Sequence, residues 1–189
     1  MYSNTLIQLN YEIMAGFFSA YSMPQAIKQI ESATRSAGSG KVWDRRSPAD
    51  LLYFFEKLEE LFGAVFIIID SRNKKQEAIL EENNGEEVWL LTRYETYCGR
   101  HRDSTPWDFF PRHLSHQEFL NPYRALKKVM YYKRHEEWKD ILKTILQHAL
   151  SPNSIYEFDD GIDLLKIWLL LHKLIEASHL LQTRILLKG

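Results

Sequence analysis

The C-terminal segment from Ile162 to Leu186 constrains the fold more than any other part of the chain. As a helix it would extend roughly 36 Å, and between Leu164 and Ile175 apolar side chains lie on nearly every side of it. A helix that is apolar all round is normally buried at the centre of a bundle. We therefore predict a mainly α fold, a bundle in which five to seven helices surround this final one.

The rest of the chain favours a single helical domain over residues 1–189. Its length fits one domain, and 45% hydrophobic with 26% charged residues is ordinary for a globular protein. The small residues at 37–40 form the clearest linker pattern in the chain, because glycine and serine disfavour regular structure. We predict that a helix over Met23–Ser36 ends there, and that a flexible linker lies near residues 37–46.

Three further helices have clear start signals or periodicity. Ser47 and Pro48 combine a capping side chain with a proline in the first turn, and apolar residues follow at helical spacing up to Leu61. Asn121-Pro122 starts another helix by the same pattern. Residues 138–149 are the most cleanly amphipathic stretch. The side chains that we expect to be buried are Trp138, Ile141, Leu142, Ile145, Trp168 and Leu169.

The stretch over residues 64–97 has conflicting signals. Ala64–Asp70 is rich in β-branched residues, whereas the residues after it have a helical pattern. We favour a buried helix that reaches about Glu82, with a small β-hairpin within 64–97 as the alternative. Between Cys98 and Pro122 we expect a loop, with a capping pattern at Ser115–Glu118 and aromatic residues that cover the bundle like a lid.

The net charge and the lack of a targeting signal in the sequence predict an ordinary cytoplasmic protein. The formal net charge of −1 gives no overall attraction to nucleic acid or membrane, and Cys98, the single cysteine, excludes a disulfide framework. The N-terminus lacks the basic start of a secretory signal. No apolar run approaches the roughly 20 residues that cross a bilayer. We expect the cytoplasm as the compartment and no membrane partner.

Two stretches of the C-terminal half carry a resemblance to other proteins. The first joins residues 94–100 (YETYCGR) to 105–112 (TPWDFFPR), and the second runs from Asn121 through Trp138 to Ser151 and resumes at 173–180 (KLIEASHL). Together they resemble an uncharacterised group of helical proteins from Bacteroidetes bacteria. The resemblance implies a cytoplasmic helical fold. Because the group has no assigned activity, it implies no catalytic residue.

The first candidate site is on the C-terminal helix. His172, Glu176 and His179 lie within about 60° of one another on an ideal helix, and Glu176-x-x-His179 has the spacing found in di-iron bundles. The second Glu-x-x-His that such a site requires is absent from the chain. We favour a buried polar cluster in which a loop arginine pairs with Glu176; a divalent metal site and acid–base chemistry are the alternatives. The histidines that could complete a mononuclear metal site are His113, His116 and His148.

The second candidate site is a basic, aromatic segment over residues 93–135. It holds nine Lys and Arg against four acids, and nine Tyr, Trp and Phe are interleaved with them. Cations contact phosphates and aromatic rings stack on unpaired bases, so single-stranded nucleic acid is one candidate ligand. Residues 50–87, with ten acids against four bases, are the partner that we favour, within the chain or across a homodimer. The proposed surface comprises Trp107, Arg112, Arg124, Lys127, Lys128, Lys133 and Arg134.

Cys98 is a third candidate, since His101 and neighbouring arginines could lower its thiol pKa. A small buried side chain is the interpretation that we favour for it.

Known catalytic signatures are missing from the sequence. It contains no phosphate-binding glycine loop, nucleophile elbow, His-Glu-x-x-His or zinc-type cysteine spacing. We therefore expect a non-enzymatic protein-interaction or regulatory module, working through a protein partner or as a homo-oligomer, with no cofactor. The alternative is a metal-binding bundle protein or hydrolase that uses Glu176 and His179. A single-stranded nucleic-acid binder ranks third.

Overall fold

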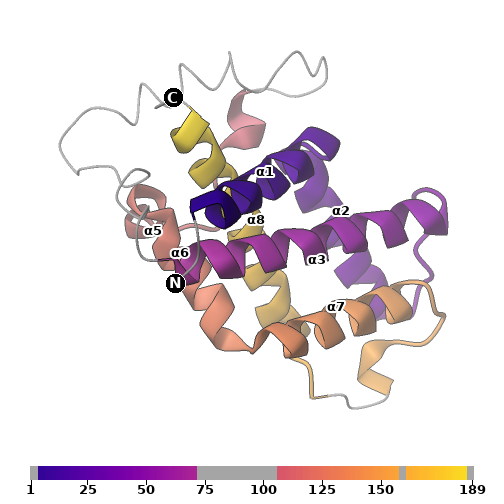
Figure 1. Cartoon of the computed structure of the whole chain (residues 1–189). Helices are drawn as coiled ribbons and strands as arrows, with labels where there is room; N and C mark the ends of the chain where they lie inside the picture. The colour runs from indigo at the N-terminus through magenta and orange to yellow at the C-terminus, as the bar shows by residue number, and fades with distance from the viewer. Residues whose placement is uncertain (1–3, 72–105, 158–160, 187–189) are drawn as a thin grey trace.

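The computed structural model describes residues 4–71, 106–157 and 161–186, and these form an all-α structure without strands. This confirms the predicted mainly α class. Short 3-10 turns at Pro106–Phe109 and Ile155–Glu157 accompany seven α-helices in the described residues. The helices are α1 (Asn4–Ala20), α2 (Met23–Ser39), α3 (Pro48–Asp70), α5 (His116–Leu120), α6 (Pro122–Tyr132), α7 (His135–Ala149) and α8 (Leu164–Leu186) (Figure 1).

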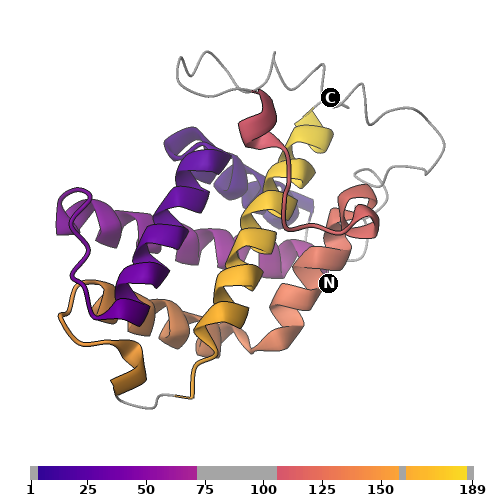
Figure 2. The ribbon, with the colours of Figure 1, turned by 180° about the vertical axis from the view of Figure 1, so that it is seen from behind.

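Helix α8 is central, as its apolar sequence predicts. It packs along α6 on one side and α2 on the other, and α1 also contacts it. Figure 2 shows α2, α8 and α6 side by side, with α3 running across behind them. From Leu170 to Arg184, every side chain of α8 except the half-buried Lys173 is buried. The bundle is therefore built around this helix, whose polar residues are enclosed with the apolar ones.

The predicted linker differs from the structure at its start. Helix α2 continues through residues 37–39 and ends at Ser39, and Gly40 caps it with a φ of 64° that suits a residue without a Cβ. Ala37 is fully buried, and a Cβ at Gly38 would lie 3.0 Å from Leu164 Cδ2. The small residues therefore allow close packing of α2 and do not form a linker at 37–39. Further along, Trp43 is buried and donates its backbone N–H to the Ala149 carbonyl at 2.7 Å.

Helix α3 resolves part of the ambiguous stretch. Ala64, Val65, Ile68 and Ile69 share one face of this helix and all four are buried. The helix ends at Asp70. The strand alternative is therefore wrong for residues 64–70, because burial on one helical face outweighs the β preference of branched residues. Three predictions fall on residues 72–105, outside the described residues. They are the continuation of the helix to Glu82, the β-hairpin, and the candidate thiol of Cys98 beside His101.

The predicted helix starts are confirmed, with one difference in mechanism. The Ser47 hydroxyl accepts the Ala49 N–H, and Ser115 and Glu118 form a reciprocal capping box that starts α5. Helix α6 begins at Pro122, but the Asn121 side chain makes no capping hydrogen bond.

The predicted core is mostly confirmed. Four of the six side chains are buried, namely Trp138, Ile141, Leu142 and Ile145. Trp168 and Leu169 are only partly buried; Trp168 lines a surface hollow. No helix in the described part of the chain is long and apolar enough to span a bilayer.

Candidate functional site

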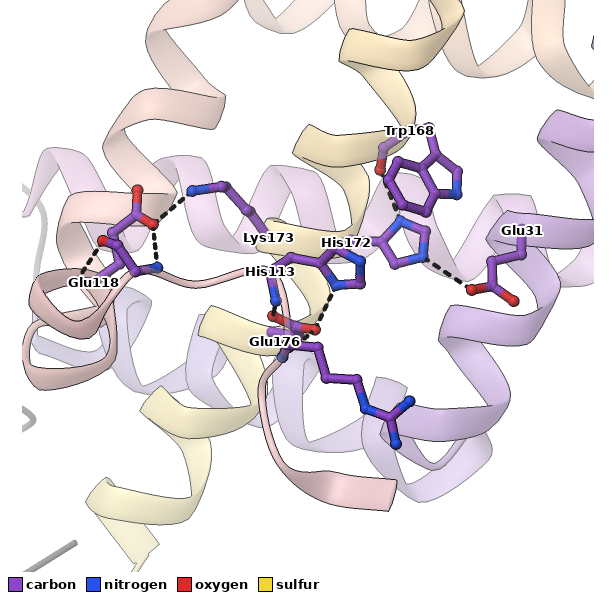
Figure 3. A network of polar contacts seen from close by, with 9 residues as sticks. Glu31, His113, Glu118, Trp168, His172, Lys173 and Glu176 are labelled. Atoms are coloured by element: carbon purple, nitrogen blue, oxygen red, sulfur yellow. Dashed lines mark hydrogen bonds and ion pairs between the residues drawn. The ribbon is translucent and has the colours of Figure 1, made fainter. Parts of the chain in front are cut away.

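Glu176 is the anchor of a polar network on α8 (Figure 3). Its side chain is 2% exposed. Oε1 accepts the Arg112 backbone N–H at 2.9 Å, and Oε2 accepts the His113 backbone N–H at 2.8 Å. The His113 ring adds a third contact, with Nδ1 2.8 Å from Oε1. A buried carboxylate requires such donors, so Glu176 fixes the segment at 112–113 against α8.

The partner of Glu176 differs from the predicted one. We expected a loop arginine to pair with it, and Arg112 does contact it, but through its backbone N–H. Because a carboxylate only accepts hydrogen bonds, His113 Nδ1 carries the proton in this contact.

His172 lies one turn before Glu176 and is fully buried. Its Nδ1 is 2.8 Å from the Trp168 carbonyl oxygen and must donate to it. Its Nε2 has no hydrogen-bond partner among the described residues, and the nearest carboxylate oxygen, Glu31 Oε1, is 3.7 Å away. Burial and the neighbouring His113 lower the pKa of His172, outweighing the Trp168 contact and the nearby carboxylates. A neutral imidazole therefore faces Glu31.

His179 belongs to a different environment. Its ring packs against Phe18 at a centroid distance of 5.0 Å and against Phe109 at 6.0 Å. Burial lowers the pKa of His179 to about 4. The three residues that we expected to act together therefore lie in two environments. His172 and Glu176 belong to the polar network, whereas His179 packs against aromatic rings one turn further on.

The arrangement does not fit the metal site that the Glu-x-x-His spacing suggested. Both oxygens of Glu176 already accept N–H donors, and Nδ1 of His172 is used by a carbonyl. Over the ranges 4–71, 106–157 and 161–186, no group of three or more His, Cys, Asp and Glu side chains could hold a metal ion. The structure places His113 beside Glu176, whereas His179 packs between aromatic rings.

A surface groove runs along α2 beside this network. One hollow of about 330 Å³ lies between α2, residues 108–113 and α8, with His113 and Glu176 in its wall. A second hollow of about 370 Å³ lies towards the C-terminal end of α2. Glu31 and Trp168 line both hollows, so the two adjoin at this pair. We call them together the α2–α8 groove.

The two ends of the α2–α8 groove differ in chemistry. The second hollow has Leu165 and Tyr156 on its rim, 73% and 62% exposed. The first hollow is lined by charged side chains of both signs, which include Lys28, Arg112 and Asp108. Glu31 and Arg35 also line the second hollow, so the groove has a more apolar end and a more charged end.

The predicted basic surface is split in the structure. Arg112 lines the α2–α8 groove, whereas Arg124, Lys127 and Lys128 lie on α6. The last two members, Lys133 and Arg134, lie in the turn before α7. The Trp107 side chain is outside the described residues.

The described ion pairs of this basic surface are made with acids of neighbouring helices. Among the described residues, Lys128 pairs with Glu118, and Lys133 and Arg134 pair with Glu137. These acids come from α5 and α7. Half of the acids of 50–87 lie in the stretch 72–87, outside the described residues, so pairing with that segment, within the chain or across a homodimer, stays a prediction. Local spacing accounts for two of the pairs, because residues three or four apart on a helix are neighbours.

Sequence reasoning missed Glu31 as a member of the site and placed His113 only as a spare histidine. Neither residue has a local motif, because each reaches the network from a separate segment that only the bundle brings to α8. Comparison of the chain with family models, with curated proteins and with solved structures finds no match. The site must therefore be interpreted from its own geometry.

Proposed function

We propose that this all-α protein is a non-enzymatic interaction module of the cytoplasm that binds an extended protein segment in the α2–α8 groove. The observation that carries the proposal is the pair of exposed apolar side chains, Leu165 and Tyr156, beside a 370 Å³ hollow. Large apolar side chains that rim a concave surface are typical of interaction sites. Burial of Leu165 by a partner would remove apolar surface from water.

The dimensions and charges of the groove favour a peptide segment as its occupant. Along α2 the lining residues extend from Met23 to Arg35, about 18 Å at helical rise. An extended chain covers that length with about five or six residues. Side chains of both charge signs at one end, Lys28 and Arg112 with Glu31 and Asp108, suit a segment that combines an apolar anchor with charged residues.

The test selects peptides directly on the purified protein. A random heptapeptide phage library is selected on the wild type, and the enriched peptides are titrated against Leu165→Lys and Leu52→Lys. Leu52 is the matched control, because it is 47% exposed on α3 and lines neither hollow. We expect Leu165→Lys to weaken binding at least tenfold and Leu52→Lys to leave it unchanged. Enriched peptides that bind all three proteins equally would overturn the proposal.

A second copy of the chain is the partner that homo-oligomerisation would require. Sedimentation of the wild type and of the same two variants distinguishes this case. Loss of the oligomer in Leu165→Lys alone would identify the groove occupant as another copy. A monomeric wild type that still selects peptides would point to a different protein.

One observation favours a second candidate function. The Glu176–His113 pair, with 2.8 Å between Oε1 and Nδ1, lies in the wall of the charged hollow. A carboxylate that orients an imidazole is a common general-base arrangement, so the predicted hydrolase would use His113 in place of His179. Hydrolysis of p-nitrophenyl acetate or p-nitrophenyl phosphate that falls about 100-fold or more in His113→Asn, but not in His179→Asn, would support it. Rates at the buffer background would oppose it.

A further inference from the structure

Helix α6 presents a basic and aromatic outer face that the α2–α8 groove does not use. Its apolar side chains Leu126 and Val129 are buried on the side that packs against α8. On the outer side, Arg124 and Lys128 are exposed and Tyr131 is 78% exposed. Positions 124, 128 and 131 are four and three residues apart, so these side chains share one face.

The cations of this face are held in place by acceptors from α5. Arg124 Nη1 donates to Gln117 Oε1 at 2.7 Å, and Lys128 Nζ donates to Glu118 Oε1 at 2.7 Å. Glu118 also accepts Lys173 of α8 through its other oxygen, as Figure 3 shows. Side chains that are already fixed lose little conformational entropy when a ligand binds.

The face carries an excess of positive charge. Among the described residues, Glu118 is the one carboxylate that pairs with any of these cations, and it pairs with Lys128 and Lys173. Arg124 and Lys127 have no carboxylate partner in the described part of the chain. Glu118 itself is 1% exposed. From residue 122 to 135 the sequence contains five Lys and Arg and no Asp or Glu. Helix α6 itself carries three of these cations and no acid, whereas Lys133 and Arg134 follow the helix and pair with Glu137.

We infer that the outer face of α6 binds single-stranded nucleic acid, with Arg124, Lys127 and Lys128 at the phosphates and Tyr131 stacked on an unpaired base. Phosphate groups match the cations, and an unpaired base matches the Tyr131 ring. An acidic peptide would satisfy the cations but would leave the ring without a partner. A duplex would leave it unused as well, because its bases are already stacked.

The test measures binding of a fluorescein-labelled oligouridine of about twelve nucleotides by anisotropy between roughly 50 and 200 mM salt. Three phosphate contacts predict a slope of about −2 in log affinity against log salt. We expect Tyr131→Ala to weaken binding at least fivefold, Tyr131→Phe to retain it, and Lys127→Gln to make the slope shallower by about 0.7. The matched control is Lys139→Gln, a lysine of α7 that pairs with Glu59 and should have no effect.

The result separates this surface from its competitors. Equal binding of polyglutamate, with no effect of Tyr131→Ala, would mean an acidic protein partner and would overturn the inference. Absence of oligouridine binding at the lowest salt concentration would overturn it too. Leu165→Lys should leave oligouridine binding unchanged, so failure of the groove proposal and failure of this one are distinguishable.

Discussion

Two buried glutamates hold neighbouring segments against α8 by different means. Glu176 accepts two backbone N–H groups and the His113 ring, all from one short segment. Glu118 accepts two lysine ammonium groups and the Ser115 N–H. Backbone donors fix a loop without adding a full charge, whereas ammonium donors gather cations at the surface. The first arrangement shapes the wall of the groove, and the second supports the basic face of α6.

The largest expected effect comes from removal of the Glu176 carboxylate. Glu176→Ala would leave the Arg112 and His113 N–H groups without acceptors and create a cavity in α8. We expect a loss of about 3–5 kcal/mol in the free energy of unfolding, measured by urea denaturation. If stability changes by less than about 1 kcal/mol, the 112–113 segment is not fixed by this carboxylate.

Acid should destabilise the protein in two separate steps. Burial lowers the pKa of His179 to about 4 in the folded state, from an ordinary value of 6.5. The unfolded chain therefore binds more protons than the folded one between pH 6.5 and 4, and stability falls as the pH falls through that window. The shift corresponds to about 3 kcal/mol, and the lowered pKa of His172 acts in the same direction.

Glu118 accounts for the second, more acidic step. Burial alone would raise its pKa, but the hydrogen bonds from Lys128, Lys173 and the Ser115 backbone outweigh burial and lower the pKa to about 2, from an ordinary value of 4.5. The contribution of Glu118 to the free energy of unfolding is thus present above pH 4.5 and is lost as the pH falls towards 2. Urea denaturation of the wild type and of His179→Leu at about pH 7, 5 and 3.5 tests whether the His179 step precedes the Glu118 step as the pH falls. A slope between pH 6.5 and 4 that is unchanged in His179→Leu would contradict the first assignment.

Replacement of Glu118 should cost less than replacement of Glu176. Glu118→Gln removes the negative charge under Lys128 and Lys173, but the Lys128 side chain is 63% exposed and is solvated by water instead. We expect a loss of about 2 kcal/mol in urea denaturation. A loss equal to that of Glu176→Ala would mean that cationic and backbone donors are equivalent here.

The smallest expected changes in stability come from replacement of the two lysines that share Glu118. Lys128→Ala removes an exposed partner and should cost less than about 1 kcal/mol. Lys173→Ala removes a side chain that is only 15% exposed, and we expect a loss of about 1–2 kcal/mol. Thermal or urea denaturation of both variants measures the difference. A larger cost for Lys128→Ala would reverse this ranking of the two contacts.

Local patterns predicted the helices well. The reciprocal bonds of Ser115 and Glu118 and the spacing from Trp138 to Ile145 involve residues within a few positions of one another, so the sequence itself contains the information. Gly38 misled the prediction, because a glycine that allows close packing against Leu164 cannot be told from a linker glycine by residue type alone. That distinction depends on a partner far away in the chain.

The candidate site could be predicted only in part. His172 and Glu176 were found because they are one helical turn apart. His113 is 63 residues from Glu176 along the chain, and Glu31 reaches His172 from α2. No periodicity connects such residues, and the expected arginine side chain was replaced by backbone N–H donors that every residue except proline has.

The sequence by itself determined that this protein is helical, that its last helix is central, and which helical faces are apolar, because these properties depend on periodicity and on neighbours within a turn. The tertiary structure alone decided which polar residue meets which. It brought His113 to Glu176 and left His179 between Phe18 and Phe109. The physical reason is that a buried polar group must find donors or acceptors wherever the fold supplies them, and their source follows from how the helices cross.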